Sequence, residues 1–249
     1  MNIKRDNTYI NQGNNPACLI EVHNHQMRRI EMGTISVNKL AGYSMMVGPT
    51  LALVCYFITP GGMFIDTANP AAANEVVAAL QGNSTLAAIT GILVPVGLIV
   101  FFSGLSQFVA NMSGGSGHAI ARLGTPLVLI SIIGWVIGSG ITIGISNGAA
   151  LGEAAFYPIQ VGITAVSTLG TILFGVGAML IACAASKRDE NNTYMAYVAS
   201  LAGIVAAVTG VIGGISSGQL ELMTMIGGIC FLVFTIWSII VGLAMSSSD

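Results

Sequence analysis

The polar side chains most able to bind a ligand occur as a stripe inside one long apolar segment of this sequence. At 100° per residue the stripe falls on one side of a helix; its members are Gln160, Thr164, Ser167, Thr168 and Thr171. A polar stripe in an apolar span faces other helices or water rather than lipid. It indicates either a surface that lines a path for a solute or interhelical hydrogen bonding, and the tendency of Ser and Thr to bond the preceding turn favours the second.

The sequence gives no comparable support for catalysis or for metal binding. Proton transfer and metal binding need ionisable side chains held in place, and no apolar segment carries a charge at its centre. His23 and His25 with Cys18 could be imagined as a metal site, but their segment shows no helical period that would fix them. No phosphate-binding loop, zinc-protease motif or nucleophile elbow is present. We therefore expect no enzyme activity, no metal and no cofactor.

The composition predicts that the apolar segment carrying this stripe lies in a membrane. Only 8 Lys and Arg and 10 Asp and Glu occur among 249 residues, so that 7% are charged, and mean hydropathy is +0.82. A soluble domain carries about 25% charged residues. A net charge of −2 offers no polybasic surface for nucleic acid. These values predict an integral, multi-pass membrane protein, in the plasma (inner) membrane if the chain is prokaryotic.

Segments long enough to cross about 30 Å of hydrocarbon as helices occur six times. They are placed at 40–59, 86–110, 120–146, 159–185, 195–215 and 222–245. The predicted fold class is therefore all-α, a polytopic bundle of six transmembrane helices spread over 32–249. Residues 1–31 are polar and lack helical periodicity, and they are expected to be a disordered tail or an upstream extension before a start at Met32.

The positions of the charges predict the topology. With the N-terminus inside, all eight basic residues fall in the inside segments, and the loops 60–85, 147–158 and 216–221 hold none. Basic residues are retained on the cytoplasmic side of a membrane, so both termini are predicted inside. The first outside loop also has helix signals, with Asn69 as N-cap, Pro70 at the first position and Gly82 as a stop. A short helix is expected there, on the outer surface or over the mouth of the bundle.

Small residues mark two helix faces for close packing. The fifth segment has Ala202, Ala206, Gly210 and Gly214 at four-residue spacing, which predicts a groove for a neighbouring helix. The third segment has the pair Gly134 and Gly138 at the same spacing. The partner helix could belong to the same chain or to another protomer.

The sequence resembles no characterised family of transporters, membrane cytochromes or intramembrane proteases. The absence of catalytic groups and the small-residue faces favour a structural or accessory subunit of a membrane assembly. Its partners would be the lipid bilayer and other membrane subunits or further copies of the chain, and not nucleic acid. The alternative is a small transporter or channel for a neutral or weakly polar solute, which the stripe from Gln160 to Thr171 would line.

Overall fold

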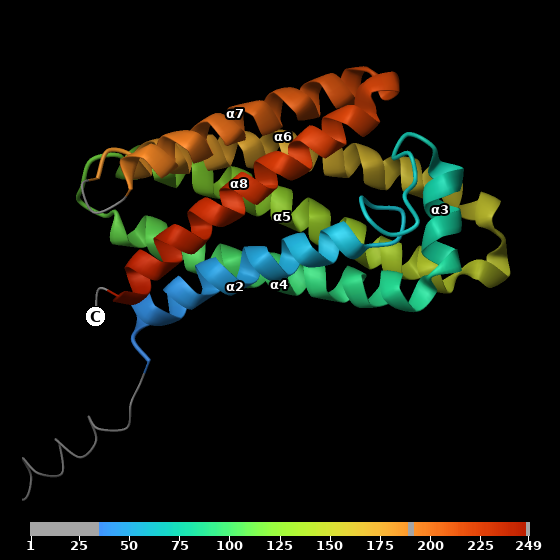
Figure 1. Cartoon of the computed structure of the whole chain (residues 1–249), viewed down its shortest axis with the longest axis horizontal. Helices are drawn as coiled ribbons and strands as arrows, with labels where there is room; N and C mark the ends of the chain where they lie inside the picture. The colour runs from blue at the N-terminus through green and yellow to red at the C-terminus, as the bar shows by residue number, and fades with distance from the viewer. Residues whose placement is uncertain (1–34, 189–191, 248–249) are drawn as a thin grey trace, which may run out of the picture. The chain divides into compact units, whose positions relative to one another are not determined.

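The computed structural model of the chain describes residues 35–188 and 192–247. The described residues from Ser36 onward form one compact unit, and the predicted tail 1–31 lies outside the described residues. Over the described ranges the chain is helical and contains no strand. Figure 1 shows the α-helices, which are α2 (Val37–Ile58), α3 (Ala73–Gly82), α4 (Ser84–Asn111), α5 (His118–Asn147), α6 (Tyr157–Ala185), α7 (Thr193–Ile215) and α8 (Leu220–Ser247). Short 3₁₀ turns occur at η1 (Ala149–Leu151), η2 (Glu153–Phe156) and η3 (Ser217–Gln219).

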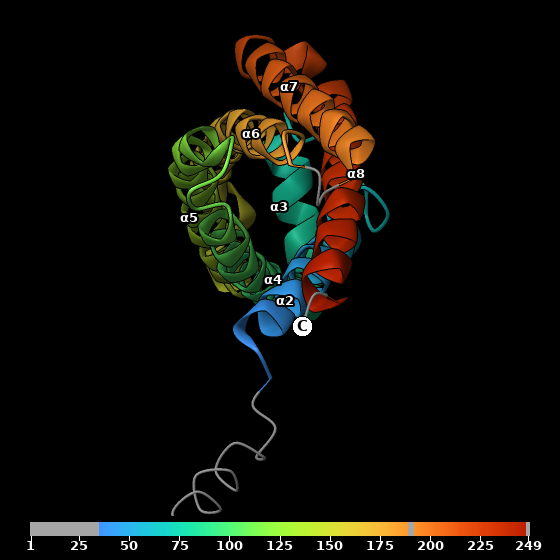
Figure 2. The ribbon, with the colours of Figure 1, turned by 90° about the vertical axis from the view of Figure 1, so that its left-hand side faces the viewer.

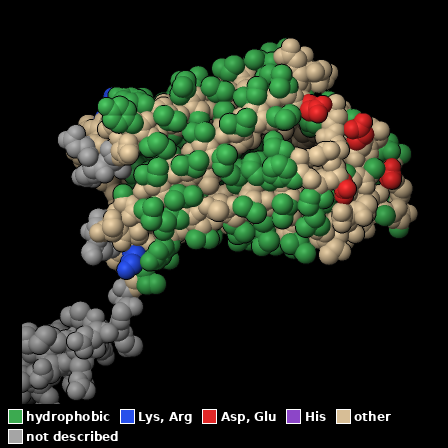
Figure 3. Space-filling model, in the orientation of Figure 1, with side chains coloured by type: hydrophobic (Ala, Val, Ile, Leu, Met, Phe, Trp, Pro, Cys, Tyr) green, Lys and Arg blue, Asp and Glu red, His purple; other side chains and the backbone are tan. Residues whose placement is uncertain are grey.

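Every α-helix except α3 is long and apolar enough to cross a membrane, which gives six candidate spans in the described chain. The all-α class that the sequence predicts is therefore confirmed, and each of the six predicted spans corresponds to a helix long and apolar enough to cross a membrane. Large apolar side chains cover much of the outer surface between the two ends of the bundle (Figure 3). Apolar surface exposed on this scale is unusual in a soluble monomer. It supports a multi-pass integral membrane protein.

Local signals in the sequence set several helix ends. The Ser36 hydroxyl accepts the backbone N–H of Lys39 at the start of α2, and Asn192 caps α7 in the same way through Met195. Gly117 precedes α5 with φ of 86°, a left-handed conformation that favours glycine. A Cβ at Gly117 would also lie 2.7 Å from the Ala184 carbonyl oxygen. The loop before α5 can therefore pack tightly against the end of α6.

The six long helices form a closed ring. Each packs on the next in the order α2, α4, α5, α6, α7 and α8, and α8 packs back on α2. In Figure 2, which views the bundle down the axis of this ring, α3 lies across the far end. Because α3 packs on α5, α6 and α4, it covers the end of the ring where those helices meet.

Reciprocal glycine contacts hold neighbouring helices of the ring together. In each contact, a Cβ added to one glycine would lie 2.5 to 2.8 Å from the carbonyl oxygen of the other, closer than real side chains come. Backbones this close gain van der Waals contact and weak Cα–H···O bonds. The four pairs are Gly42 with Gly242, Gly48 with Gly97, Gly124 with Gly177, and Gly175 with Gly203.

A buried hydrogen bond compensates for the proline inside α2. Pro49 has no backbone N–H, so the carbonyl oxygen of Met45, four residues earlier, loses its helical partner. The Ser238 hydroxyl of α8 donates to this oxygen at 2.6 Å, and both residues are fully buried. The bond joins α8 to α2 beside the glycine pair that already brings them together.

The charged side chains of the described chain separate to the two ends of the bundle (Figure 3). We call the end where α2 and α5 begin and α6 ends the basic end; it carries Lys39, Arg122, Lys187 and Arg188. The opposite, acidic end carries Asp66, Glu75, Glu153 and Glu221. This separation gives the bundle a fixed electrical polarity along its axis.

Candidate functional site

A cavity of about 610 Å³ lies inside the ring and receives side chains from every α-helix of the described chain. On α2 its lining runs from Pro49 toward the acidic end, and on α8 it stops at Thr235. On α6 the lining runs from Gln160 to Phe174. The cavity therefore occupies the acidic half of the bundle, whereas aromatic and aliphatic side chains fill the basic half.

All five residues of the predicted polar stripe on α6 line this cavity. The hydroxyls of Thr164, Thr168 and Thr171 donate to the carbonyl oxygens of Gln160, Thr164 and Ser167, one turn earlier on the same helix. Gln160 differs from them. Its side chain is only 7% exposed, and its Oε1 has no hydrogen-bond partner. An unpaired buried amide oxygen is costly, so Gln160 is the polar group of the lining with the most to gain from a ligand.

Threonines on other helices add to the polar lining and escape notice in the sequence. They lie in apolar segments with few polar neighbours, and no repeated polar pattern like that on α6 marks the space that they share. Each hydroxyl donates to a carbonyl oxygen of its own helix; the residues are Thr90, Thr142, Thr209, Thr224 and Thr235. Only the closure of the ring brings them together around the cavity.

Five aromatic rings form the floor of the cavity toward the basic end. Neighbouring rings among them have centroids 5.1 to 5.9 Å apart, mostly tilted or edge-on; the five are Phe101, Trp135, Phe174, Phe231 and Phe234. These are the separations and angles that aromatic pairs prefer. The indole N–H of Trp135 donates to the Ser167 carbonyl oxygen at 3.4 Å. The floor separates the cavity from the packed basic half.

Helix α3 and the segment before it cover the acidic end of the cavity. Val76, Val77 and Leu80 are buried against the ends of α4, α5 and α6, and Val76 and Leu80 also line the cavity. Gln81 Nε2 donates to the Ile145 carbonyl oxygen at 3.2 Å, which ties α3 to α5. The short helix expected in this loop is present, and its packed face is the one with Val76, Val77 and Leu80.

The predicted start of this helix was wrong by several residues, although it ends at Gly82 as expected. Asn69 is not the N-cap, because its Oδ1 accepts the backbone N–H of Ala71, two residues on, in an Asx turn. The Glu75 carboxylate in turn accepts the N–H of Asn69 at 3.0 Å. The helix begins only at Ala73, since the turn occupies the residues before it.

The small residues predicted to form one groove on α7 divide between two neighbours. Ala202 and Ala206 pack with Cys230 of α8. Gly210 approaches α6, where a Cβ would lie 2.6 Å from Ile172 Cγ1, and Gly214 is exposed beside Thr168. Because α7 lies between α6 and α8, small residues are needed on both of its sides.

On α5, Gly134 and Gly138 both face α6. A Cβ at these positions would lie 3.2 Å from Val166 and 3.5 Å from Ile163. The two helices come closer than this at Gly124 and Gly177, where a Cβ would lie 2.6 to 2.8 Å from the carbonyl oxygen of the other glycine. The spacing of glycines within one segment therefore does not reveal where two helices come closest.

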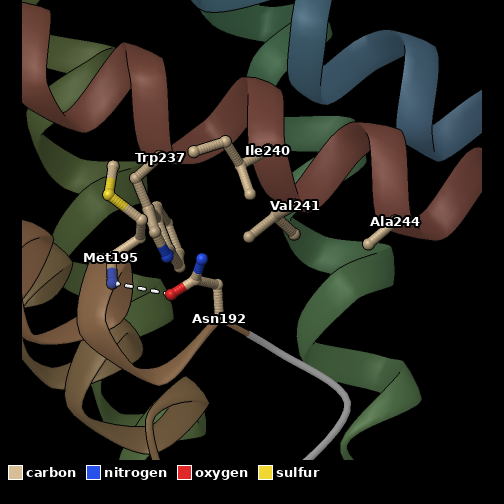
Figure 4. Close-up of a pocket in the computed structure, with 6 residues that line it drawn as sticks. All are labelled: Asn192, Met195, Trp237, Ile240, Val241 and Ala244. Carbon is tan, nitrogen blue, oxygen red and sulfur yellow. Dashed lines mark hydrogen bonds between the residues drawn. The ribbon is translucent and has the colours of Figure 1, made fainter.

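A second, much smaller cavity lies near the basic end between the start of α7 and α8 (Figure 4). Its volume of about 20 Å³ has room for about one water molecule. The Asn192 side chain beside it is engaged as the cap of α7, because its oxygen accepts the Met195 N–H at 3.2 Å. This cavity is too small for a solute, whereas the central cavity is large enough, and we therefore take the central cavity as the candidate site.

Among the described residues no group of His, Cys, Asp and Glu side chains is arranged to hold a metal ion. Comparison of the chain with known protein families, curated proteins and solved structures finds no match. The function is therefore inferred from the arrangement of the cavity.

Proposed function

We propose that this protein is a small transporter that binds a neutral or weakly polar solute in the central cavity and passes it across the membrane. The cavity itself carries the proposal. Its volume of about 610 Å³ is that of a small-molecule site. Among the described residues lining it, hydroxyls and the Gln160 amide supply the polarity and Glu221 is the one charged side chain. A charged solute would have no opposite charge deep in such a site, whereas a neutral one needs none.

The accessory-subunit function that the sequence favoured stays a prediction. Its chief support was the lack of groups able to do chemistry, and a transporter of neutral solutes needs none of these groups either. A subunit that only packs against other proteins does not need a cavity of this size with polar groups on its wall, because empty space costs van der Waals contact. The cavity therefore favours the solute-binding function.

We also propose that the acidic end faces outward and that both termini lie inside. The support is the position of all eight basic residues of the chain in the segments assigned to the inside. In this orientation the cavity and α3 lie on the outer side, and the aromatic floor lies between the cavity and the cytoplasm. The structure then corresponds to a state whose binding site is on the outer side of the barrier.

Cysteine labelling tests this orientation. Ala150, in η1, and Ser113, between α4 and α5, are exposed at the acidic and basic ends. An impermeant maleimide added to intact cells is expected to label Ala150→Cys and to label Ser113→Cys only after permeabilisation. The unsubstituted chain measures the background from its own cysteines. Labelling of Ser113→Cys in intact cells would reverse the proposed orientation.

Filling part of the cavity is expected to weaken solute binding while leaving the fold intact. Thr164 lines the cavity, whereas Leu169 on the same helix is 56% exposed on the outer surface. Thr164→Trp should weaken binding of neutral solutes at least tenfold, because the indole takes their space, and Leu169→Trp should not. The assay is thermal stabilisation of the purified proteins by a panel from glycerol to cyclohexanol, followed by uptake into proteoliposomes.

The same experiment separates the two functions. If no solute of the panel stabilises or crosses with the unsubstituted protein, and the protein instead purifies in fixed stoichiometry with another membrane protein, the accessory-subunit function is the correct one. If Thr164→Trp and Leu169→Trp behave alike toward a solute that binds, that solute occupies a different site.

A further inference from the structure

We infer that the central cavity selects solutes that donate hydrogen bonds, namely alcohols or N–H compounds with an apolar body, and that Gln160 Oε1 is the acceptor that recognises them. This inference rests on the proposed function and names the class of solute.

Of the ten threonines that line the cavity, all but Thr67 already use their hydrogen-bond donor within the protein. A hydroxyl has one proton to donate and two lone pairs to accept with. Each of these hydroxyls lies 2.7 to 3.1 Å from a carbonyl oxygen of its own helix, to which it donates; they are Thr59, Thr90, Thr142, Thr164, Thr168, Thr171, Thr209, Thr224 and Thr235. They therefore present methyl groups and acceptor lone pairs to the cavity.

The other polar groups of the lining also offer few free hydrogen-bond donors to a solute. The indole N–H of Trp135 is used by the Ser167 carbonyl oxygen, and the Glu221 carboxylate at the acidic end only accepts. No Lys or Arg is among the described residues of the lining. Thr67, Ser139, Ser167 and Tyr56 are left as hydroxyl donors, and the Gln160 amide nitrogen can donate as well. The acceptor lone pairs of the bonded threonines and of Glu221 still outnumber these donors around the cavity.

Gln160 supplies the strongest of these acceptors. Its Oε1 has no partner and less than 1 Å² of accessible surface, so a solute reaches it only when the Gln160 amide, which lines the cavity, turns that oxygen toward the solute. A buried amide oxygen gains most from a donor that arrives with a ligand, because it has already lost its hydration. Val94, Leu98 and Ile163 line the cavity as well and offer apolar contact for the rest of the solute.

An ether of the same shape makes a poor substitute for an alcohol in such a site. It brings only lone pairs, so Gln160 Oε1 stays unpaired when the ether displaces water from the cavity. Sites built to bond a substrate hydroxyl reject analogues that lack it for this reason. We expect about a tenfold difference in affinity, which corresponds to one net hydrogen bond.

Cyclohexanol and methoxycyclohexane are suitable probes, since neither absorbs where tryptophan does. Trp135 lines the cavity, so its fluorescence should change when a probe binds to the full-length protein in nanodiscs. The dissociation constant of the alcohol is expected to be about tenfold lower than that of the ether. Gln160→Met should bring the two constants together. Gln107→Leu is the control and should leave their ratio unchanged, because Gln107 bonds Asn111 near the basic end, away from the cavity.

Each result decides a different point. Equal affinities of the unsubstituted protein for the two probes would overturn the selection of donors and leave a solute-binding cavity standing. Absence of binding by both probes up to their solubility limits would count against the proposed function and the inference together. The comparison of probes on the unsubstituted protein decides these points even where Gln160→Met does not fold.

Discussion

Replacement of Gly175 by leucine is expected to abolish the folded bundle. Gly175 of α6 faces α7, and a Cβ there would lie 2.6 Å from both the backbone nitrogen of Ala207 and the carbonyl oxygen of Gly203. Both atoms belong to the backbone, so no side chain can turn aside to make room. The helices would have to separate, and this would also disturb the neighbouring contact between Gly177 and Gly124.

The expected loss exceeds the usual cost of overpacking, which is about 1 to 3 kcal/mol. In lipid, helices associate through close van der Waals fit rather than through the hydrophobic effect, so a separation of backbones removes the attraction itself. Proteins are stable by only about 5 to 15 kcal/mol. We therefore expect no monodisperse protein from Gly175→Leu.

Gly140→Leu is the matched control. Gly140 lies inside α5, as Gly175 lies inside α6, but it is exposed and a Cβ there meets no atom within 4 Å. Thermal aggregation in one detergent, followed by size-exclusion chromatography, compares the two variants. A Gly175→Leu protein as stable as Gly140→Leu would mean that α6 and α7 do not touch at these glycines.

The number of spans could be predicted from the sequence because length and apolar content decide it within one segment. The span placed at 86–110, for example, is the helix Ser84–Asn111. The glycine contacts could not be predicted in this way. Gly175 and Gly203 belong to different segments, and their meeting depends on how two helices are rotated. The regular spacing from Ala202 to Gly214 was visible within one segment, yet those residues face two different neighbours.

The cavity, too, could not be predicted from any single segment of the sequence. The stripe on α6 was visible because its residues share one face of one helix. A stripe of this kind packs against another helix in some folds and lines a space in others, and the closure of the ring decides between the two. Thr90 and Thr235 face the same space from α4 and α8, where no polar stripe like that on α6 marks the face. Ser238, one turn after Thr235, donates to the Met45 carbonyl oxygen of α2 instead. Likewise the aromatic floor draws on α4, α5, α6 and α8, and no single segment shows it.

Truncation of one ring of that floor is expected to open the cavity toward the basic end. Phe234 is 3% exposed, and its ring centroid lies 5.9 Å from that of Phe101, 5.2 Å from Phe174 and 5.0 Å from Trp237. Phe234→Ala removes the ring that joins the floor to the packed basic half. Such truncations of buried Phe cost about 3 to 5 kcal/mol in stability.

The functional effect distinguishes this change from simple destabilisation. If the floor is the barrier on the basic side of the site, Phe234→Ala should increase the passive leak of a transported solute through proteoliposomes, even as the melting temperature falls. The control is Phe64→Ala, since Phe64 is 67% exposed in the segment before α3 and should change neither property much. Stopped-flow or tracer flux measures the leak, and thermal aggregation measures stability. A Phe234→Ala protein that melts earlier but leaks no faster would place the barrier deeper, where Phe108 and Trp237 pack with ring centroids 6.0 Å apart.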